Sequence, residues 1–327
     1  MLKQITSKAF HFFWRGMAMG LAEVVPGVSG GTIAFITGIY ERLIGVINKL
    51  RFSLLGTFRK EGLAGVFKAL DGFFLTWLIV GMGTGVVTGV FTLTWVLEHY
   101  PQLLWAFFFG LIISSSYFIG KQIKHWNALR IILLMVGILI AYQVSIAIPV
   151  QNEPTFLYLL FCGSIAISAL ILPGISGSFL LLILGMYTVV IPALKDLLKD
   201  PVNGPWLIIV PFAIGCFIGL ISISRVLSWT FKKYHDQTLA ILTGIMIGSL
   251  YKLWPWRNVS LWVDKTTNDF SSVIPVSREG EWVPISETNV FPHEYSGDPL
   301  IFPVLLCFTA GIVLLLFMEK RMEEEQL

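Results

Sequence analysis

Long apolar segments separated by short polar links dominate the chain. A helix needs about 20 predominantly apolar residues to cross a bilayer. By this measure the pattern predicts six membrane-spanning helices, at 73–97, 102–120, 128–149, 205–227, 237–254 and 299–318. The last two are separated by a polar segment, 255–298, which predicts a long loop.

Two further apolar stretches, 11–47 and 156–193, are each interrupted by a loop rich in proline, glycine and serine. The loops read Pro26-Gly27-Val28-Ser29-Gly30-Gly31-Thr32 and Pro173-Gly174-Ile175-Ser176-Gly177-Ser178. Proline removes a backbone donor and glycine weakens a helix, so both stretches are predicted to break there. Each stretch could be one long broken span or a re-entrant hairpin. Proline followed by three glycines favours the hairpin.

The composition places these segments in a membrane. Of the 327 residues, 55% are hydrophobic and 13% are charged, and the mean hydropathy is +0.77. Soluble domains are nearer one quarter charged. We therefore expect an all-α polytopic membrane protein. The segment 48–71 is basic and amphipathic, which predicts a helix lying on the membrane surface.

Lysine and arginine are unevenly distributed among the predicted loops. Three loops would share one side with the N-terminus if each interrupted stretch is a hairpin, and they carry Arg51, Arg59 and Lys60; Lys121, Lys124 and Arg130; and Lys232 and Lys233. The segment 255–298 falls on the other side and carries seven acidic residues against three basic ones. Cytoplasmic loops carry the excess of Lys and Arg. This predicts cytoplasmic N- and C-termini and an external loop 255–298.

The two halves of the chain resemble each other. A shift of 147 residues superimposes the interrupted stretches, and a shift of 134 superimposes the following spans. The matched pairs include Gly16 with Gly163, Pro26 with Pro173, Ser29 with Ser176, Gly38 with Gly185, Tyr40 with Tyr187, Gly81 with Gly215, Trp95 with Trp229 and Gly110 with Gly244. This predicts two repeats, 1–150 and 151–327, each with one hairpin and three spans. Because each repeat crosses the membrane three times, an odd number, the second repeat would begin on the opposite side and have the inverse orientation. Chance similarity between glycine-rich apolar segments is the alternative.

The hairpin tips are the candidate binding site. If helix resumes at Ser29 and at Ser176, each serine is a good N-cap and the next backbone N–H groups are unpaired. Helix N-termini attract anions. Gly30, Gly31 and Gly177 allow close approach to the backbone, while Thr32 and Ser178 add hydroxyl groups. Inverted symmetry would bring the tips together near the bilayer midplane, around a phosphate or carboxylate. Alternatively, these glycines only permit close helix packing.

Arg15 and Glu23 lie in the part of the first interrupted stretch that precedes its loop. Arg15 and Glu23 have Cys162 and Leu170 as their repeat mates, so symmetry does not require them. Ionisable residues inside a membrane are functional candidates. Arg15 is a candidate partner for an anionic ligand, or it extends to the interface. Glu23 is a candidate carrier of a coupling proton or a residue that orients the tip.

Other chemistries find little support in the sequence. Cys162, Cys216 and Cys307 lie inside apolar stretches, the five histidines have no ligand spacing, and no nucleotide-binding or hydrolase motif is present. We therefore expect no metal, no cofactor, no enzymatic activity and no nucleic-acid partner. Transport would be secondary, driven by an ion gradient or by the gradient of the substrate.

The first motif also carries a family resemblance. Glu23 to Thr32, followed by Gly38-Ile39-Tyr40-Glu41, resembles the signature of the bacterial and archaeal polyprenyl-phosphate transporter family. Leu172 to Ser178, with Gly185-Met186-Tyr187, looks like the degenerate second copy of this signature.

This resemblance implies that the protein returns undecaprenyl phosphate from the outer to the cytoplasmic leaflet of the inner membrane. The lipid would then be recycled as the carrier for cell-envelope polymers. A transporter or channel for a small anion and a membrane enzyme acting on lipid phosphates remain alternatives. The sequence leaves open the coupling ion, a proton or sodium, and the oligomeric state.

Overall fold

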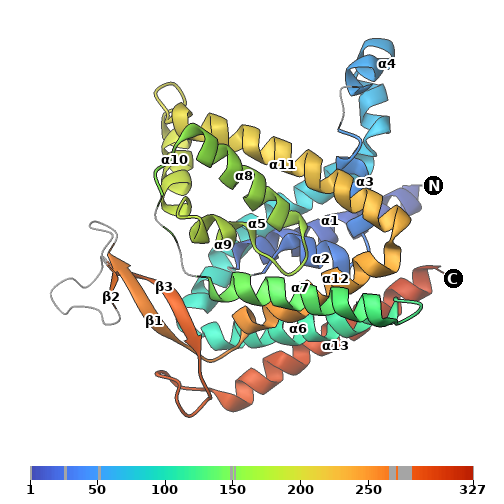
Figure 1. Ribbon diagram of the computed structural model, residues 1–327. Helices are drawn as coiled ribbons and strands as arrows, with labels where there is room; N and C mark the ends of the chain where they lie inside the picture. Colours follow the sequence, from blue (N-terminus) through green and yellow to red (C-terminus); the bar gives the residue numbers. More distant parts are fainter. Residues whose placement is uncertain are drawn as a thin grey trace.

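The computed structural model describes residues 2–25, 28–50, 53–147, 150, 152–264, 270–271 and 282–326. These residues form a helical bundle with a small sheet at one end (Figure 1). The first half contains α1 (Leu2–Val24), α2 (Gly30–Ile36), α3 (Tyr40–Ile47), α4 (Ser53–Ala69), α5 (Gly72–His99), α6 (Pro101–Lys121) and α7 (Ala128–Ile146). The second half contains α8 (Phe156–Ile171), α9 (Gly177–Ile183), α10 (Tyr187–Lys199), α11 (Trp206–Lys233), α12 (His235–Ser249), the 3₁₀ helix η1 (Leu250–Leu253) and α13 (Ile301–Gln326).

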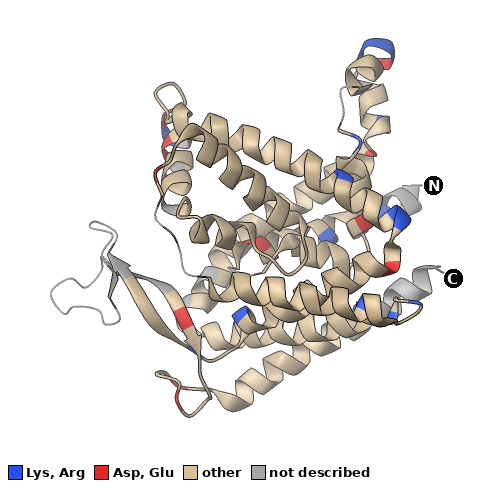
Figure 2. Ribbon diagram, in the orientation of Figure 1, with Lys and Arg blue, Asp and Glu red and all other residues tan. Residues whose placement is uncertain are grey.

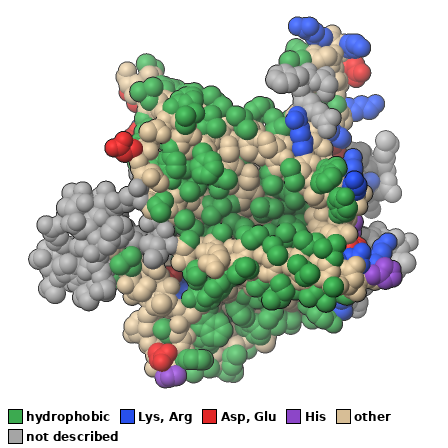
Figure 3. Space-filling view, viewed as in Figure 1, with side chains coloured by type: hydrophobic (Ala, Val, Ile, Leu, Met, Phe, Trp, Pro, Cys, Tyr) green, Lys and Arg blue, Asp and Glu red, His purple; other side chains and the backbone are tan. Residues whose placement is uncertain are grey.

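The long apolar helices establish a mostly helical polytopic membrane protein. Among the described residues, α5, α6, α7 and α11 contain segments that are long and apolar enough to cross a bilayer. Shorter apolar segments occupy Phe156–Ile171 and Ile301–Phe317. The segment predicted as a span at 237–254 is divided between α12 and η1. Hydrophobic side chains cover most of the visible face of the bundle (Figure 3), as expected of a surface that contacts lipid.

Both interrupted stretches break near the predicted loops, and each breaks a second time. Pro26 and Gly27 lie outside the described residues, between the end of α1 and the start of α2. The second breaks fall at Gly38 and Gly185, whose φ angles are 70° and 72°. At each glycine the next N–H donates to the carbonyl five residues back, as in a Schellman cap. The part of each stretch that follows the loop, expected as a single helix, therefore consists of two short helices.

The long helices pack in four principal pairs. In the first half α1 packs against α5, and in the second half α8 packs against α11. The other two pairs cross between the halves, because α6 packs against α13 and α7 against α12 (Figure 1). Glycines bring these helices into backbone contact, since a Cβ atom would strike the carbonyl of the partner. The contacts are Gly16 with Leu78, Gly81 with Phe13, Gly163 with Phe212, Gly215 with Leu160, Gly110 with Phe308 and Gly244 with Leu134.

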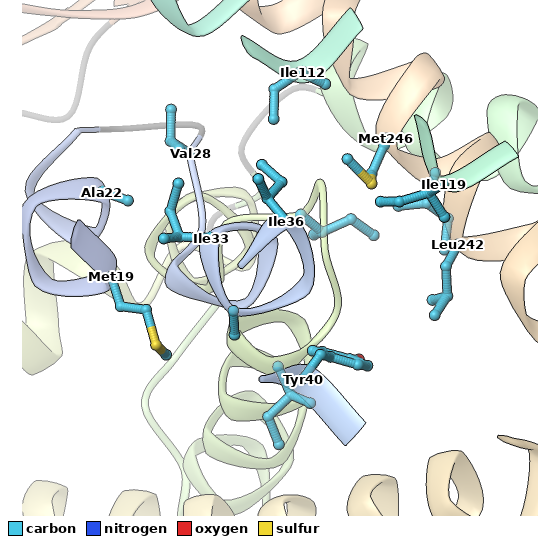
Figure 4. Close-up of a cluster of buried hydrophobic side chains, with 14 of the residues drawn as sticks. Met19, Ala22, Val28, Ile33, Ile36, Tyr40, Ile112, Ile119, Leu242 and Met246 are labelled. Carbon is cyan, nitrogen blue, oxygen red and sulfur yellow. The ribbon is translucent and has the colours of Figure 1, made fainter. Parts of the chain in front are cut away.

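The apolar core gathers around α2. Ile33 and Ile36 are buried, and the cluster that they join extends to Ile112 of α6 and Met246 of α12 (Figure 4). Tyr40, the first residue of α3, is only 2% exposed and packs against Phe35 and Phe231. The first interrupted stretch is therefore at the centre of the protein.

The segment predicted as a polar loop, 255–298, contains an antiparallel sheet. Its strands are β1 (Arg257–Asp264), β2 (Phe270–Ser271) and β3 (Trp282–Asn289), in the order β2-β1-β3. Trp254 donates its indole N–H to the Val290 carbonyl, and Trp256 donates to the Pro299 carbonyl. These bonds fix the base of the sheet to the helices.

The two ends of the bundle differ in charge. Most of the Lys and Arg residues in Figure 2 lie at the end that carries both termini and α4, whereas the sheet lies at the opposite end. The segment 48–71, predicted as a helix on the membrane surface, contains α4, which projects from the bundle. Its backbone is non-helical at Gly62, where φ is 65°, so α4 consists of two helical pieces.

Candidate functional site

Ser29 caps the first tip as the sequence predicts. Its φ and ψ angles, −122° and 137°, are extended, and its Oγ accepts a hydrogen bond from Gly31 N at 3.1 Å. The same hydroxyl donates to the carbonyl oxygen of Leu170 at 2.9 Å. Because Leu170 belongs to α8, this serine both begins α2 and joins the first tip to the second interrupted stretch.

The Glu23 carboxylate occupies the N-terminus of α2. Its Oε1 accepts a hydrogen bond from Gly30 N at 2.6 Å. Glu23 is the penultimate residue of α1, so a side chain at the end of α1 satisfies the first N–H group of α2. The sequence predicts that this N–H group is unpaired and open to a ligand. In the structure the carboxyl group of Glu23 already accepts its hydrogen bond, at a helix end whose dipole favours negative charge.

The two tips are in contact. Gly174 N donates to Thr32 Oγ1 at 2.8 Å, and the backbone of Gly31 lies against the carbonyl oxygens of Leu170 and Ile171. Ser29 and Thr32 are each 1% exposed. The expectation that the tips meet is confirmed. The hydroxyl groups of the first tip contact the second stretch.

The second tip is the more open of the two. Ser176 is the N-cap of α9, and its Oγ accepts from Phe179 N at 3.4 Å. Ser176 Oγ also lies 2.9 Å from Ser178 Oγ. Gly177 packs tightly against the Ala166 carbonyl, whereas Ser178 is exposed. Ser178 is thus the tip hydroxyl that a molecule from outside the protein reaches first.

Arg15 lies apart from the tips. It lines a cavity of about 380 Å³ together with Lys8, His11, Phe12, Arg42 and Phe73. None of the tip residues that the structure describes lines this cavity. The structure therefore brings Ser29, Gly30, Gly31 and Thr32 together with Glu23 and with the second stretch, and it places Arg15 in a different environment.

A charged cluster next to the second tip was not anticipated from the sequence. Lys252 Nζ lies 4.6 Å from the centroid of the Phe179 ring, and 3.8 Å from the Glu287 carboxylate. Glu287 pairs with Arg257 at 2.8 Å, and the Arg257 guanidinium stacks over Trp105 at 4.2 Å. Burial lowers the pKa of Arg257, although Glu287 opposes this effect. No local sequence signal links these residues, because strand pairing brings Arg257 and Glu287 together.

These features define a class: a polytopic helical membrane protein with two interrupted helices that meet in its interior. The family model described as VCA0040-like, undecaprenyl phosphate translocase-like, matches residues 19–271. The chain belongs to this family, and the resemblance found in its motifs is confirmed.

Two relatives match over most of their length. The chain is 41% identical over 316 residues to the polyprenyl-phosphate transporter of Vibrio cholerae serotype O1, covering 95% of this chain and 96% of the relative. It is 30% identical over 271 residues to the polyprenyl-phosphate transporter of Staphylococcus aureus, covering 76% of this chain and 88% of the relative. No solved structure matches the chain.

Proposed function

We propose that the protein is a secondary transporter that moves polyprenyl phosphate from the outer to the cytoplasmic leaflet of the inner membrane. This movement would return the carrier lipid for cell-envelope synthesis. The observation that carries the proposal is the contact between the two interrupted helices, in which Gly174 N donates to Thr32 Oγ1. Non-helical backbone at membrane depth is tolerated where it is buried in protein or lines a cavity, and such breaks mark transporter binding sites. The names of the two relatives support the choice of substrate.

The proposed architecture is a pair of inverted repeats, 1–150 and 151–327, in which 11–47 and 156–193 are re-entrant. The glycine contacts support it, because they correspond under the sequence shifts. Gly16 contacts Leu78 as Gly163 contacts Phe212, and both members of the contact move by the expected 147 and 134 residues. The packing between the halves has the same symmetry. In the repeat, α6 corresponds to α12 and α13 corresponds to α7, so the pair α6–α13 corresponds to the pair α12–α7.

The proposed orientation places both termini and α4 in the cytoplasm and the sheet outside. The gathering of Lys and Arg at the end that carries the termini supports this choice. The extracytoplasmic end would then include β1 and β3, close to the second tip.

In the proposed mechanism, the lipid phosphate binds between the tips while the isoprenoid tail remains in the bilayer. Ser178, Ser176 and Gly177 would receive it first, because Ser178 is exposed. The phosphate would then displace the Glu23 carboxylate from Gly30 N and bind the N-terminus of α2, with Ser29, Gly31 and Thr32 completing the site. A proton transferred to Glu23 would remove its negative charge when the phosphate arrives. Replacing the hydration of a phosphate by such groups lowers the high cost of moving it through hydrocarbon.

Leaflet-specific labelling of undecaprenyl phosphate in proteoliposomes tests the proposal. The wild type should accelerate translocation over protein-free vesicles. Ser29→Ala, Ser176→Ala and Glu23→Gln should each lower the rate, Glu23→Gln by about tenfold, because each removes a group that binds or exchanges with the phosphate. Ser145→Ala is the matched control, since Ser145 Oγ donates to the Ala141 carbonyl of its own helix.

The outcomes separate the function from the site. A wild-type protein that leaves the lipid in its original leaflet would refute the proposed function. Wild-type rates in all three variants would instead refute the assignment of the site. Uptake of inorganic phosphate by the same vesicles measures the alternative, a transporter or channel for small anions. Repeating the assay at two pH values, with and without sodium, identifies the coupling ion.

A further inference from the structure

The cavity beside Arg15 is lined by one face of α1. Lys8, His11, Phe12 and Arg15 are spaced at i, i+3, i+4 and i+7, so they follow each other along the same side of the helix. Three of the four are basic residues, and together with Phe12 they face a cavity of about 380 Å³. At roughly 30 Å³ per water molecule, this cavity has room for a phosphate group and part of its hydration shell.

Arg42 lines the cavity from a different helix. It lies in α3, and its guanidinium pairs with Asp71 through Nη2 at 2.6 Å and Nε at 2.8 Å. The same guanidinium stacks over the rings of Phe12, at 4.7 Å, and Phe74, at 4.5 Å. Arg42 is thus held in place by two aromatic rings and one carboxylate.

Basic side chains predominate in the lining of the cavity. Among the described residues that line it, Lys8, His11, Arg15 and Arg42 are basic and none is acidic, while Asp71 pairs with Arg42. The lining of a larger cavity, of about 550 Å³, includes Lys49 and Lys232 but also Glu41. A phosphate monoester carries about −1.5 to −2 at neutral pH, whereas a phosphodiester carries one negative charge. The more basic lining of the smaller cavity therefore favours a monoester.

We propose that the cavity lined by Lys8, His11, Arg15 and Arg42 is a second binding site for a phosphate monoester, through which the lipid phosphate passes after the tips. This inference rests on the proposed function. Arg15 and Glu23 are eight residues apart in α1, about 12 Å at 1.5 Å per residue. The site therefore lies about two helical turns from the first tip, toward the end of the bundle that carries the termini. Lys8 and Arg42 have a role that the tip residues do not have: they attract the phosphate headgroup away from the N-terminus of α2.

Binding of a short-chain prenyl phosphate to the full-length protein in neutral-lipid nanodiscs tests this site. Lys8→Gln is the informative variant, because Lys8 is exposed and takes no part in the proposed tip site. It should weaken binding by about tenfold, as expected for the loss of one charge-assisted hydrogen bond. Lys8→Arg should restore affinity to within about threefold of the wild type. Lys49→Gln, which removes the same charge from the neighbouring cavity, should leave affinity unchanged.

The competitors identify the ligand. Inorganic phosphate in excess should displace the prenyl phosphate from the wild type, and phosphatidylglycerol, a diester, should not. Equal competition by phosphatidylglycerol would overturn the assignment to a monoester, and equal affinity of Lys8→Gln and the wild type would overturn the site. If the wild type translocates the lipid while Lys8→Gln alters neither binding nor translocation, this inference fails and the proposed function stands. If the wild type binds prenyl phosphate through Lys8 but translocates no lipid, the proposed function and the passage of lipid through the cavity fail, and the binding site stands.

Discussion

At the scale of single residues, Gly31 has the least room for change in the contact between the tips. A Cβ atom there would meet the carbonyl oxygens of Leu170 and Ile171, both of which belong to the backbone of α8. Backbone atoms cannot rotate away as a flexible side chain can. The glycine is therefore required by the approach of the two stretches, whether or not a ligand is present.

Gly31→Ala should accordingly destabilise the protein by about 1–3 kcal/mol, the usual cost of overpacking a filled interior. Thermal or denaturant unfolding in detergent measures the change. Gly45→Ala is the matched control, because a Cβ atom at Gly45 in α3 meets nothing within 4 Å. It should be neutral or stabilising by up to about 1 kcal/mol, since alanine favours helix. Equal stabilities of the two variants would contradict the packing argument.

The candidate site was partly predictable at this scale. Ser29 and Ser176 were identified as N-caps because serine satisfies the first N–H groups of a helix wherever it precedes one. The bond from Gly30 N to Glu23 was not predictable. The spacing of seven residues places the carboxylate near the tip, but only the path of the turn decides which N–H group it reaches. The sequence makes Arg15 a candidate partner for an anionic ligand but does not say where its side chain lies, and the structure places it in the lining of a cavity apart from the tips.

At the scale of elements, the Gly-x-Tyr motifs end α2 and α9. Gly38 N donates to the Phe35 carbonyl at 3.2 Å, and Ile39 N donates to the Ala34 carbonyl at 3.0 Å. This pattern requires a left-handed residue at position 38, which glycine adopts without steric cost. The hydrophobic pattern predicts one continuous helix between the first loop and residue 47. The motif itself carries the signal for the second break, because glycine after an apolar run is a common helix C-terminus.

Gly38→Ala should therefore destabilise the protein by roughly 1–2 kcal/mol, the cost of a left-handed conformation with a Cβ atom. Gly38→Asn should be better tolerated, because asparagine visits this conformation more readily. Thermal unfolding of the two variants beside the wild type measures the difference. An alanine variant as stable as the asparagine variant would show that the turn adapts to residue 38.

The sheet between η1 and α13 is the element that the sequence did not reveal. Hydrophobic pattern identifies helices in the membrane because a span must be apolar along its whole length. The segment 255–298 is polar and rich in proline and aromatic residues, so its pattern indicates only a loop. Its strands are held by pairing with each other and by Trp254 and Trp256, which donate to Val290 and Pro299. Such distant contacts leave no periodic signature.

At the scale of the whole molecule, the proposed orientation predicts which ends of the bundle can be labelled from outside the cell. After Cys162, Cys216 and Cys307 are replaced by serine, a single cysteine at Lys60 or His293 reports on each end. Both sites are exposed; Lys60 lies on α4 and His293 follows β3. A membrane-impermeant thiol reagent should label His293→Cys in intact bacterial cells. It should label Lys60→Cys only after the membrane is opened. The reverse pattern would contradict the proposed orientation.

The pairing of α6 with α13 also governs how the protein is made. Lys121 ends α6 and Ile301 begins α13, so 301 − 121 = 180 positions separate the two helices in the order of synthesis. At 5–20 residues per second, a ribosome needs about 9–36 s to cover this distance. In the finished protein 56% of the apolar segment of α6 is buried. During that interval α6 lies in the membrane without α13 beside it. The nascent chain therefore exposes a helix surface that lipid or an insertion factor must shield until the last helix leaves the ribosome.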